Sequence, residues 1–156
     1  MSSSPYATVL VGTDGSESSF RAVDRAANIA RDAGATLLLV CAYRPMSARE
    51  VQDAQDALGS ESYKVSGSTP AEDVLRDAAD RAKALGARDV QIQAVVGDPV
   101  DVLVDLAEER AADLLVVGNR GLNSLAGRLL GSVPANISHR AACDVLIVHT
   151  TGRGRS

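Results

Sequence analysis

The residues best suited to chemistry are glycines with polar neighbours that follow apolar segments. The longest pattern is Gly118-Asn119-Arg120-Gly121, then nine residues, then Gly131-Ser132-Val133. Glycines let backbone N–H groups approach phosphate oxygens, and successive N–H groups form an anion-binding concavity. Arg120 can add charged donors and Ser132 a hydroxyl. The spacing predicts a phosphate site built largely from backbone, with tight turns as the alternative reading.

Shorter glycine turns follow other apolar segments. Gly12-Thr13-Asp14-Gly15 follows the first of them, and Gly97-Asp98 follows another. Asp14 stands where a carboxylate could accept hydrogen bonds from an adenine or ribose edge, or could stabilise the turn or cap the next helix. Ala42, near the end of a further apolar segment, leaves room for a flat base or simply packs in a sheet. The isolated glycines are equally typical of turns.

Five short apolar segments, separated by helical patterns, predict the elements that position these turns. Each is a continuous aliphatic or β-branched stretch, typical of parallel strands covered on both faces. The expected strands are Ala7–Gly12, Thr36–Tyr43, Val90–Val96, Leu114–Gly118 and Asp144–His149. Their alternation with helices predicts an α/β fold with a doubly wound parallel sheet. We expect one domain over residues 1–156, with an ordered core of about 6–150.

Apolar residues three and four positions apart predict the buried side of each helix. Ser16 is the expected N-cap of the first helix and Gly34 its stop, while Thr69 with Glu72 forms a capping box on the second. The expected buried residues are Phe20, Val23, Ala27 and Ala30, then Leu75, Ala78, Ala82 and Leu85, then Val100, Leu103 and Ala107, then Leu122, Leu125, Leu129, Val133 and Ile137. The longer connection from Arg44 to Ser68 has no assigned role.

Composition excludes several classes of protein. The net charge is −4, so nothing indicates a basic nucleic-acid footprint. No apolar run approaches the roughly 20 residues of a membrane span, and Met1–Pro5 lacks the regions of a signal peptide. A cytoplasmic protein is therefore expected. Cys41 and Cys143 are interpreted as core thiols, and His139 and His149 have no metal-ligand spacing.

Motifs of nucleotide-using enzymes are missing. The lysines, Lys64 and Lys83, do not stand in a P-loop G-x-x-x-x-G-K-[ST] pattern. The first turn does not fit the dinucleotide fingerprint G-x-G-x-x-G, and no G-x-S-x-G elbow is present. We assign no catalytic and no metal-binding residue, since Asp14 is the only candidate carboxylate. The sequence favours nucleotide binding over turnover.

The pattern Gly118-x2-Gly121-x9-Gly131-Ser132 resembles the signature of the ATP-binding branch of universal stress proteins. Val11–Ser16 and Cys143–Val148 resemble the first and last strands of that family, so the resemblance covers roughly Tyr6 to Thr150. It implies a five-stranded parallel sheet of order 3-2-1-4-5 with helices on both faces. It also implies homodimers, often formed by the last strands, and binding of ATP, AMP or cyclic AMP, in some members with Mg²⁺ or Mn²⁺.

By position, the resemblance implies a complete nucleotide site. The base and ribose would meet Gly12, Thr13, Asp14 and Ala42, and the phosphates would meet Gly118, Arg120, Gly121, Gly131, Ser132 and Val133, with Gly97 and Asn119 in the same site. The expected function is a sensor or carrier of ATP, AMP or cyclic AMP in stress response. Weak ATP hydrolysis and a ligand-free interaction protein are the alternatives. ATP and cyclic AMP both stay open, because either could use the glycine loop.

Overall fold

The structure, a computed structural model, describes residues 6–43, 70–119 and 132–149 and contains a five-stranded sheet. All strand pairs are parallel, and the strand order is β3-β2-β1-β4-β5. The strands are β1 (Thr8–Gly12), β2 (Thr36–Tyr43), β3 (Asp89–Val96), β4 (Leu114–Gly118) and β5 (Asp144–Val148). The predicted fold class and strand order are confirmed, and the predicted strand ends are right to within one residue.

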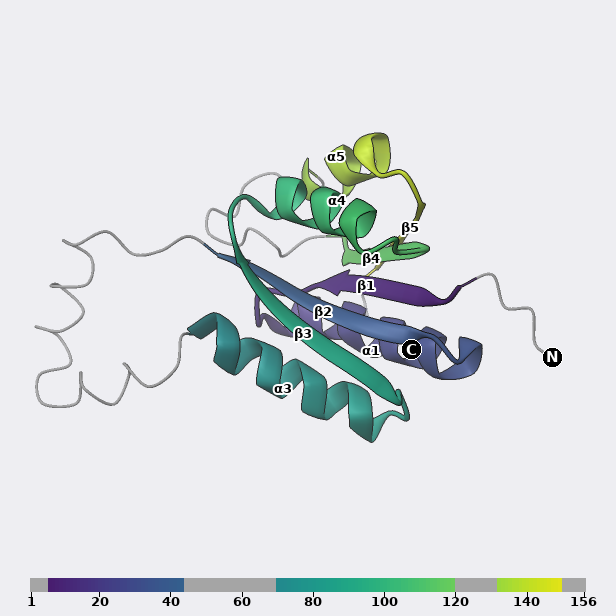
Figure 1. Cartoon of the computed structure of the whole chain (residues 1–156). Helices are drawn as coiled ribbons and strands as arrows, with labels where there is room; N and C mark the ends of the chain where they lie inside the picture. Colours follow the sequence, from purple (N-terminus) through teal and green to yellow (C-terminus); the bar gives the residue numbers. More distant parts are fainter. Residues whose placement is uncertain (1–5, 44–69, 120–131, 150–156) are drawn as a thin grey trace, which may run out of the picture.

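Helices cover both faces of the sheet. They are α1 (Glu17–Ala33), α3 (Pro70–Ala84), α4 (Pro99–Glu109) and α5 (Ser132–Arg140). Figure 1 shows α1 and α3 on one face and α4 and α5 on the other. Side chains of β1 alternate between these layers, since Val9 and Val11 join the core under α1 and α3 while Leu10 joins the core under α4. The carboxyl ends of the strands therefore lie between two helical layers.

The first helix begins and ends as its sequence predicts. The Ser16 hydroxyl accepts a hydrogen bond from the backbone N–H of Ser19 at 3.0 Å. Gly34 ends the helix at φ 68°, a left-handed conformation that favours glycine. Phe20, which we expected to be buried, is only partly buried. Its ring lies at the boundary between α1 and α3, with the guanidinium carbon of Arg81 5.1 Å from its centroid.

The prediction that every strand is covered on both faces is wrong for the two edge strands. No residue of β3 is fully buried, and its Ile92 and Val96 are 48% and 53% exposed. In β5 only Val148 is buried, and Ile147 is 44% exposed. Each strand has a neighbour on one side only. Apolar residues in an edge strand look the same in the sequence as those of a central strand.

Several expectations fall on residues outside the described ranges. These are the Thr69 cap, the connection from Arg44 to Ser68, and the apolar positions Leu122, Leu125 and Leu129. Cys41 is buried in the sheet as expected, Cys143 is half-buried, and both thiols are free. Within the described ranges, no helix combines the length and apolar character needed to cross a membrane.

Candidate functional site

The point where strand order reverses lies between β1 and β4, whose following helices pack on opposite faces. Ligands of open α/β sheets bind at such a point, beyond the carboxyl ends of the strands. A small pocket, partly open to solvent, lies here among the ends of β1 and β2 and the start of α4. Its lining consists of Gly12, Thr13, Asp14, Val40, Ala42, Pro99 and Leu103.

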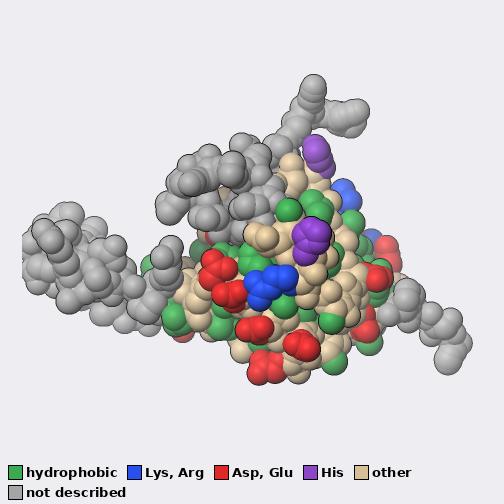
Figure 2. Space-filling view, turned by 90° about the horizontal axis from the view of Figure 1, so that it is seen from above, with side chains coloured by type: hydrophobic (Ala, Val, Ile, Leu, Met, Phe, Trp, Pro, Cys, Tyr) green, Lys and Arg blue, Asp and Glu red, His purple; other side chains and the backbone are tan. Residues whose placement is uncertain are grey.

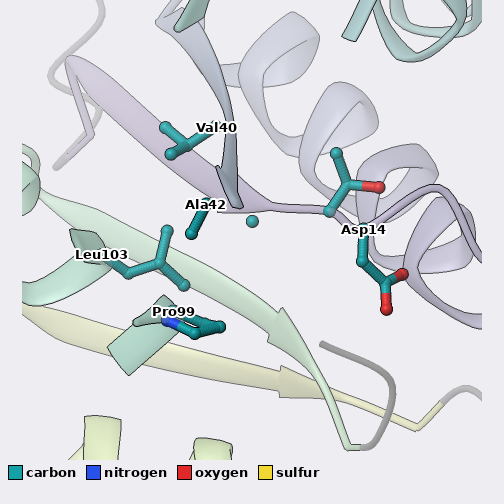
Figure 3. A pocket seen from close by; sticks show the side chains of 7 residues that line it. Asp14, Val40, Ala42, Pro99 and Leu103 are labelled. Atoms are coloured by element: carbon teal, nitrogen blue, oxygen red, sulfur yellow. The ribbon is translucent and has the colours of Figure 1, made fainter. Parts of the chain in front are cut away.

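The pocket has an apolar part and a polar rim. In Figure 3, Val40 and Ala42 of β2 lie on one side and Pro99 and Leu103 of α4 on the other. Asp14 stands apart from these side chains, on the turn that follows β1. The arrangement offers a narrow apolar slot with one carboxylate at its edge. Such a slot suits a flat, largely apolar group that carries a hydrogen-bonding edge.

Thr13 lines this pocket with its polar groups already engaged. It is 1% exposed, and its backbone N–H donates to the Val40 carbonyl at 2.9 Å. Its hydroxyl oxygen lies 2.7 Å from the Ser19 hydroxyl oxygen and accepts a hydrogen bond from the Gly15 N–H at 3.1 Å. These bonds fix the β1–α1 turn.

Asp14 has a defined structural task in the same turn. Its Oδ1 accepts a hydrogen bond from the Ser16 N–H at 2.9 Å, which closes a local turn. The other oxygen, Oδ2, accepts no hydrogen bond from the described part of the chain. Burial raises the pKa of the neighbouring Cys41 thiol, and the negative charge of Asp14 raises it further. Asp14 is thus a half-exposed carboxylate with one oxygen free for a ligand.

The connection from β3 to α4 shapes the opposite wall. Gly97 has φ 147°, and a Cβ at this position would lie 2.9 Å from the Cγ2 of Val102. The Asp98 carboxylate accepts hydrogen bonds from the N–H groups of Val100 and Asp101 at 3.1 and 3.4 Å. Gly97 is therefore required by the turn and does not line the pocket. The start of α4 is occupied by its own acidic cap.

The ends of the expected phosphate loop lie beside the pocket edge of the sheet. Gly118 is the last residue of β4, and β4 pairs with β1 in the register Val11 to Val116. The Asn119 N–H donates to the Val148 carbonyl at 2.9 Å. Ser132 and Val133 are the first two residues of α5. The remaining loop residues, Arg120, Gly121 and Gly131, lie outside the described residues, so their phosphate contacts stay predictions.

Three residues that line the pocket, and Ser19 behind it, were not identified as site residues from the sequence. Ser19 is buried behind the turn, at a helix position three residues after its cap, which makes it look like an ordinary polar helix residue. In the sequence, Val40 is typical of a strand core, Leu103 of the buried side of a helix and Pro99 of a helix start. The signal that the sequence offers for these residues is their position, because each lies near the end of a strand or near the start of a helix. No group of three or more His, Cys, Asp or Glu in the described ranges could hold a metal ion.

The surface over α4 and α5 carries charges of both signs. Figure 2 shows basic side chains with acidic ones beside them on this face, without a continuous basic area in its described part. Arg140 of α5 forms an ion pair with Asp101 of α4 at 2.8 Å.

Comparison with known proteins gives concordant matches. The model of the universal stress protein family matches residues 5–149. The universal stress protein Rv1636 of Mycobacterium tuberculosis strain H37Rv is 60% identical over 148 residues, which span 95% of this chain and 99% of that protein. A crystal structure of a universal stress protein in complex with cAMP superimposes with a TM-score of 0.70 at 51% identity, over 94% of this chain and 98% of that one.

A more distant structure shares the architecture. The universal stress protein from Archaeoglobus fulgidus in complex with dAMP has a TM-score of 0.63 at 21% identity, over 91% of this chain and 97% of that one. At this identity the likeness concerns the fold alone.

Proposed function

This chain belongs to the universal stress protein family, and from that membership we propose that its strand-end pocket binds the adenosine part of an adenine nucleotide. The observation that carries the proposal is the apolar slot with a carboxylate at its rim, at the switch point of the sheet. In this proposal the adenine ring lies between Ala42 and Leu103, and Asp14 accepts a hydrogen bond from the ribose or the base. The protein then acts as a sensor or carrier of the nucleotide.

The pocket is small and partly open to solvent, so it does not enclose a whole nucleotide. Complete small-molecule sites have volumes of roughly 300–1,000 Å³. We propose that the base and its sugar lie at the slot and that the phosphates extend beyond it. The full site therefore combines the described pocket with a second region.

The charges around the pocket indicate where the phosphates go. Asp14 stands before α1, and Asp98 caps α4. These carboxylates repel phosphate and occupy the donors that a helix start would otherwise offer. The end of β4 and the start of α5 lie at the same sheet edge, and the glycine pattern from Gly118 to Ser132 joins them. We place the phosphates there, held by backbone N–H groups and Arg120.

The relative in complex with cAMP supports an adenine nucleotide as the ligand class, since it is 51% identical over nearly the whole chain. ATP, AMP and cyclic AMP all contain the adenosine that we place at the slot. Discrimination among them then depends on the phosphate end, where Arg120 favours a multiply charged chain, with or without Mg²⁺.

Binding is a better account than catalysis. Asp14 is the only titratable side chain that lines the described pocket, and one of its oxygens holds the turn. General acid–base chemistry needs a group free to exchange a proton with the reacting atoms. The remaining lining is apolar apart from Thr13, whose hydroxyl is engaged. Slow hydrolysis is thus an outcome to test and not the proposed role.

The proposal includes a homodimer formed through β5. The edge of β5 is open in the described structure, and its Ile147 is 44% exposed. An open apolar edge strand favours pairing with a second chain. Sedimentation of Ile147→Lys should show a monomer where the wild type is a dimer. A wild-type monomer would contradict this part of the proposal.

Calorimetric titration of nucleotide-stripped protein tests the main proposal. ATP and cyclic AMP are titrated in parallel, each with and without Mg²⁺, followed by an assay for released phosphate. Binding of either nucleotide without phosphate release supports a sensor or carrier. If neither nucleotide binds, the proposal is wrong. Steady turnover faster than about 1 s⁻¹ would show that the protein acts as an enzyme instead.

A further inference from the structure

Thr13 and Ser19 are the two buried polar side chains of the described residues, each 1% exposed. They lie against each other, with 2.7 Å between their hydroxyl oxygens, directly behind the pocket rim. A buried hydroxyl is costly unless it is hydrogen-bonded, so a buried pair indicates a specific task.

The hydrogen-bond directions follow from counting protons. The Ser19 hydroxyl donates its single proton to the Ser16 carbonyl at 3.0 Å. We therefore assign the Thr13 hydroxyl as the donor to Ser19. The same Ser19 oxygen accepts from the Asp14 N–H at 3.3 Å. The Ser19 hydroxyl oxygen thus accepts two hydrogen bonds from the turn, and the hydroxyl donates one to it.

Side chains accept from three successive N–H groups of the turn, two of them through this pair. The N–H of Asp14 is bound by Ser19, that of Gly15 by Thr13 and that of Ser16 by Asp14. Three successive N–H groups are thereby held by side chains and are not available to a phosphate. These hydrogen bonds hold the turn in one conformation. The turn places the Asp14 side chain at the pocket rim.

We propose that Ser19 is a positioning residue for nucleotide recognition, which acts by holding the Asp14 carboxylate at the rim of the pocket. This inference rests on the proposed function. Removal of the Ser19 hydroxyl leaves the Asp14 N–H and the Thr13 hydroxyl without their shared acceptor. The turn then rearranges to satisfy them, and the Asp14 carboxylate leaves the position in which it meets the ligand.

A double-mutant cycle separates this role from a general loss of stability. Cyclic AMP is titrated into the wild type, Ser19→Ala, Asp14→Ala and the double variant. We expect losses of affinity of about fivefold for Ser19→Ala and about tenfold for Asp14→Ala. If Ser19 acts through Asp14, the double variant binds no more weakly than Asp14→Ala, within about twofold. A double variant that loses the product of both factors, or unchanged binding by Ser19→Ala, overturns the proposal.

Ser138→Ala is the matched control. The Ser138 hydroxyl donates to the carbonyl three residues earlier, as the Ser19 hydroxyl does, but it lies exposed on α5. Its affinity should equal that of the wild type. If Ser19→Ala is unfolded at the titration temperature, Ser19→Cys replaces it, because a thiol is a weak hydrogen-bonding group of similar size. In that case Ser19→Cys combined with Asp14→Ala should bind cyclic AMP no more weakly than Asp14→Ala alone.

The failure of this inference can be told from the failure of the proposed function. If the wild type binds neither cyclic AMP nor ATP, the proposed function is wrong, and the proposed role of Ser19 is wrong as well. If the wild type binds and the two losses are independent, only the role of Ser19 is overturned.

Discussion

The Asp14 carboxylate accepts a hydrogen bond from the backbone N–H of Ser16 at 2.9 Å, so one oxygen closes the turn at the pocket rim. The second oxygen accepts no hydrogen bond from the described residues. One side chain therefore supports both the local fold and the proposed ligand contact. Substitutions that keep one of these contributions and remove the other can separate them.

Asp14→Asn should separate the turn from ligand recognition. Its amide oxygen still accepts from the Ser16 N–H, while the second acceptor becomes an N–H₂ donor. We expect thermal stability close to that of the wild type and a loss of nucleotide affinity of about tenfold. Asp14→Ala should lose the same affinity and also about 1 kcal/mol of stability. Equal affinity of Asp14→Asn and the wild type would restrict Asp14 to the turn.

Arg81 and Asp24 join α3 to α1 through two hydrogen bonds, of 3.0 and 2.6 Å. The same guanidinium lies over the Phe20 ring. Arg81→Ala should lower the free energy of unfolding by about 1 kcal/mol, since an exposed ion pair and a cation–π contact each contribute roughly 0.5 kcal/mol. Arg81→Lys should recover only part, because Lys lacks the planar fork. Chemical denaturation measures both, and an unchanged Arg81→Ala would show that the contacts contribute nothing.

Ala111 has a left-handed backbone at φ 53°, although it is not glycine. Ala111→Gly should therefore raise the free energy of unfolding by about 0.5–1 kcal/mol. Gly34→Ala is the converse control, since Gly34 has φ 68° and a Cβ there meets no atom within 4 Å. It should lose about 1 kcal/mol from backbone strain alone. Denaturation curves that moved in the same direction for both variants would refute this reasoning.

Cys41 predicts a loss of stability at alkaline pH. Burial raises the thiol pKa above its ordinary value of 9.0, and the charge of Asp14 adds to this. The folded chain therefore keeps a proton that the unfolded chain releases, so stability is lost as pH rises above about 9. Unfolding of Cys41→Ala should depend less on pH between about pH 8 and about pH 10. A slope equal to that of the wild type would exclude Cys41 as a cause.

Much of the fold could be predicted because its signals are local. Continuous apolar strands, the Ser16 cap and the Gly34 stop each depend on neighbouring residues. Exposure of Ile92 and Ile147 could not be predicted, because it depends on which strands end at the edges of the sheet. An apolar strand has the same pattern in the centre and at the edge.

The pocket lining could be predicted where its residues lie at or just after strand ends, while their contacts with a nucleotide stay predictions. Gly12, Thr13, Asp14 and Ala42 line the pocket. Pro99 and Leu103 were not identified because the α4 wall approaches Ala42 only after the chain crosses the sheet. Ser19 was missed because its contacts depend on the turn folding back over the helix start.

The central claim is that the slot beside Ala42 holds the adenosine part of a nucleotide, and Ala42→Leu tests it most directly. The larger side chain should fill the slot and reduce cyclic AMP affinity by about 10- to 100-fold in calorimetric titration. Ala84→Leu, which adds the same side chain at an exposed position of α3, should bind as the wild type does. A folded Ala42→Leu protein with wild-type affinity would contradict the claim.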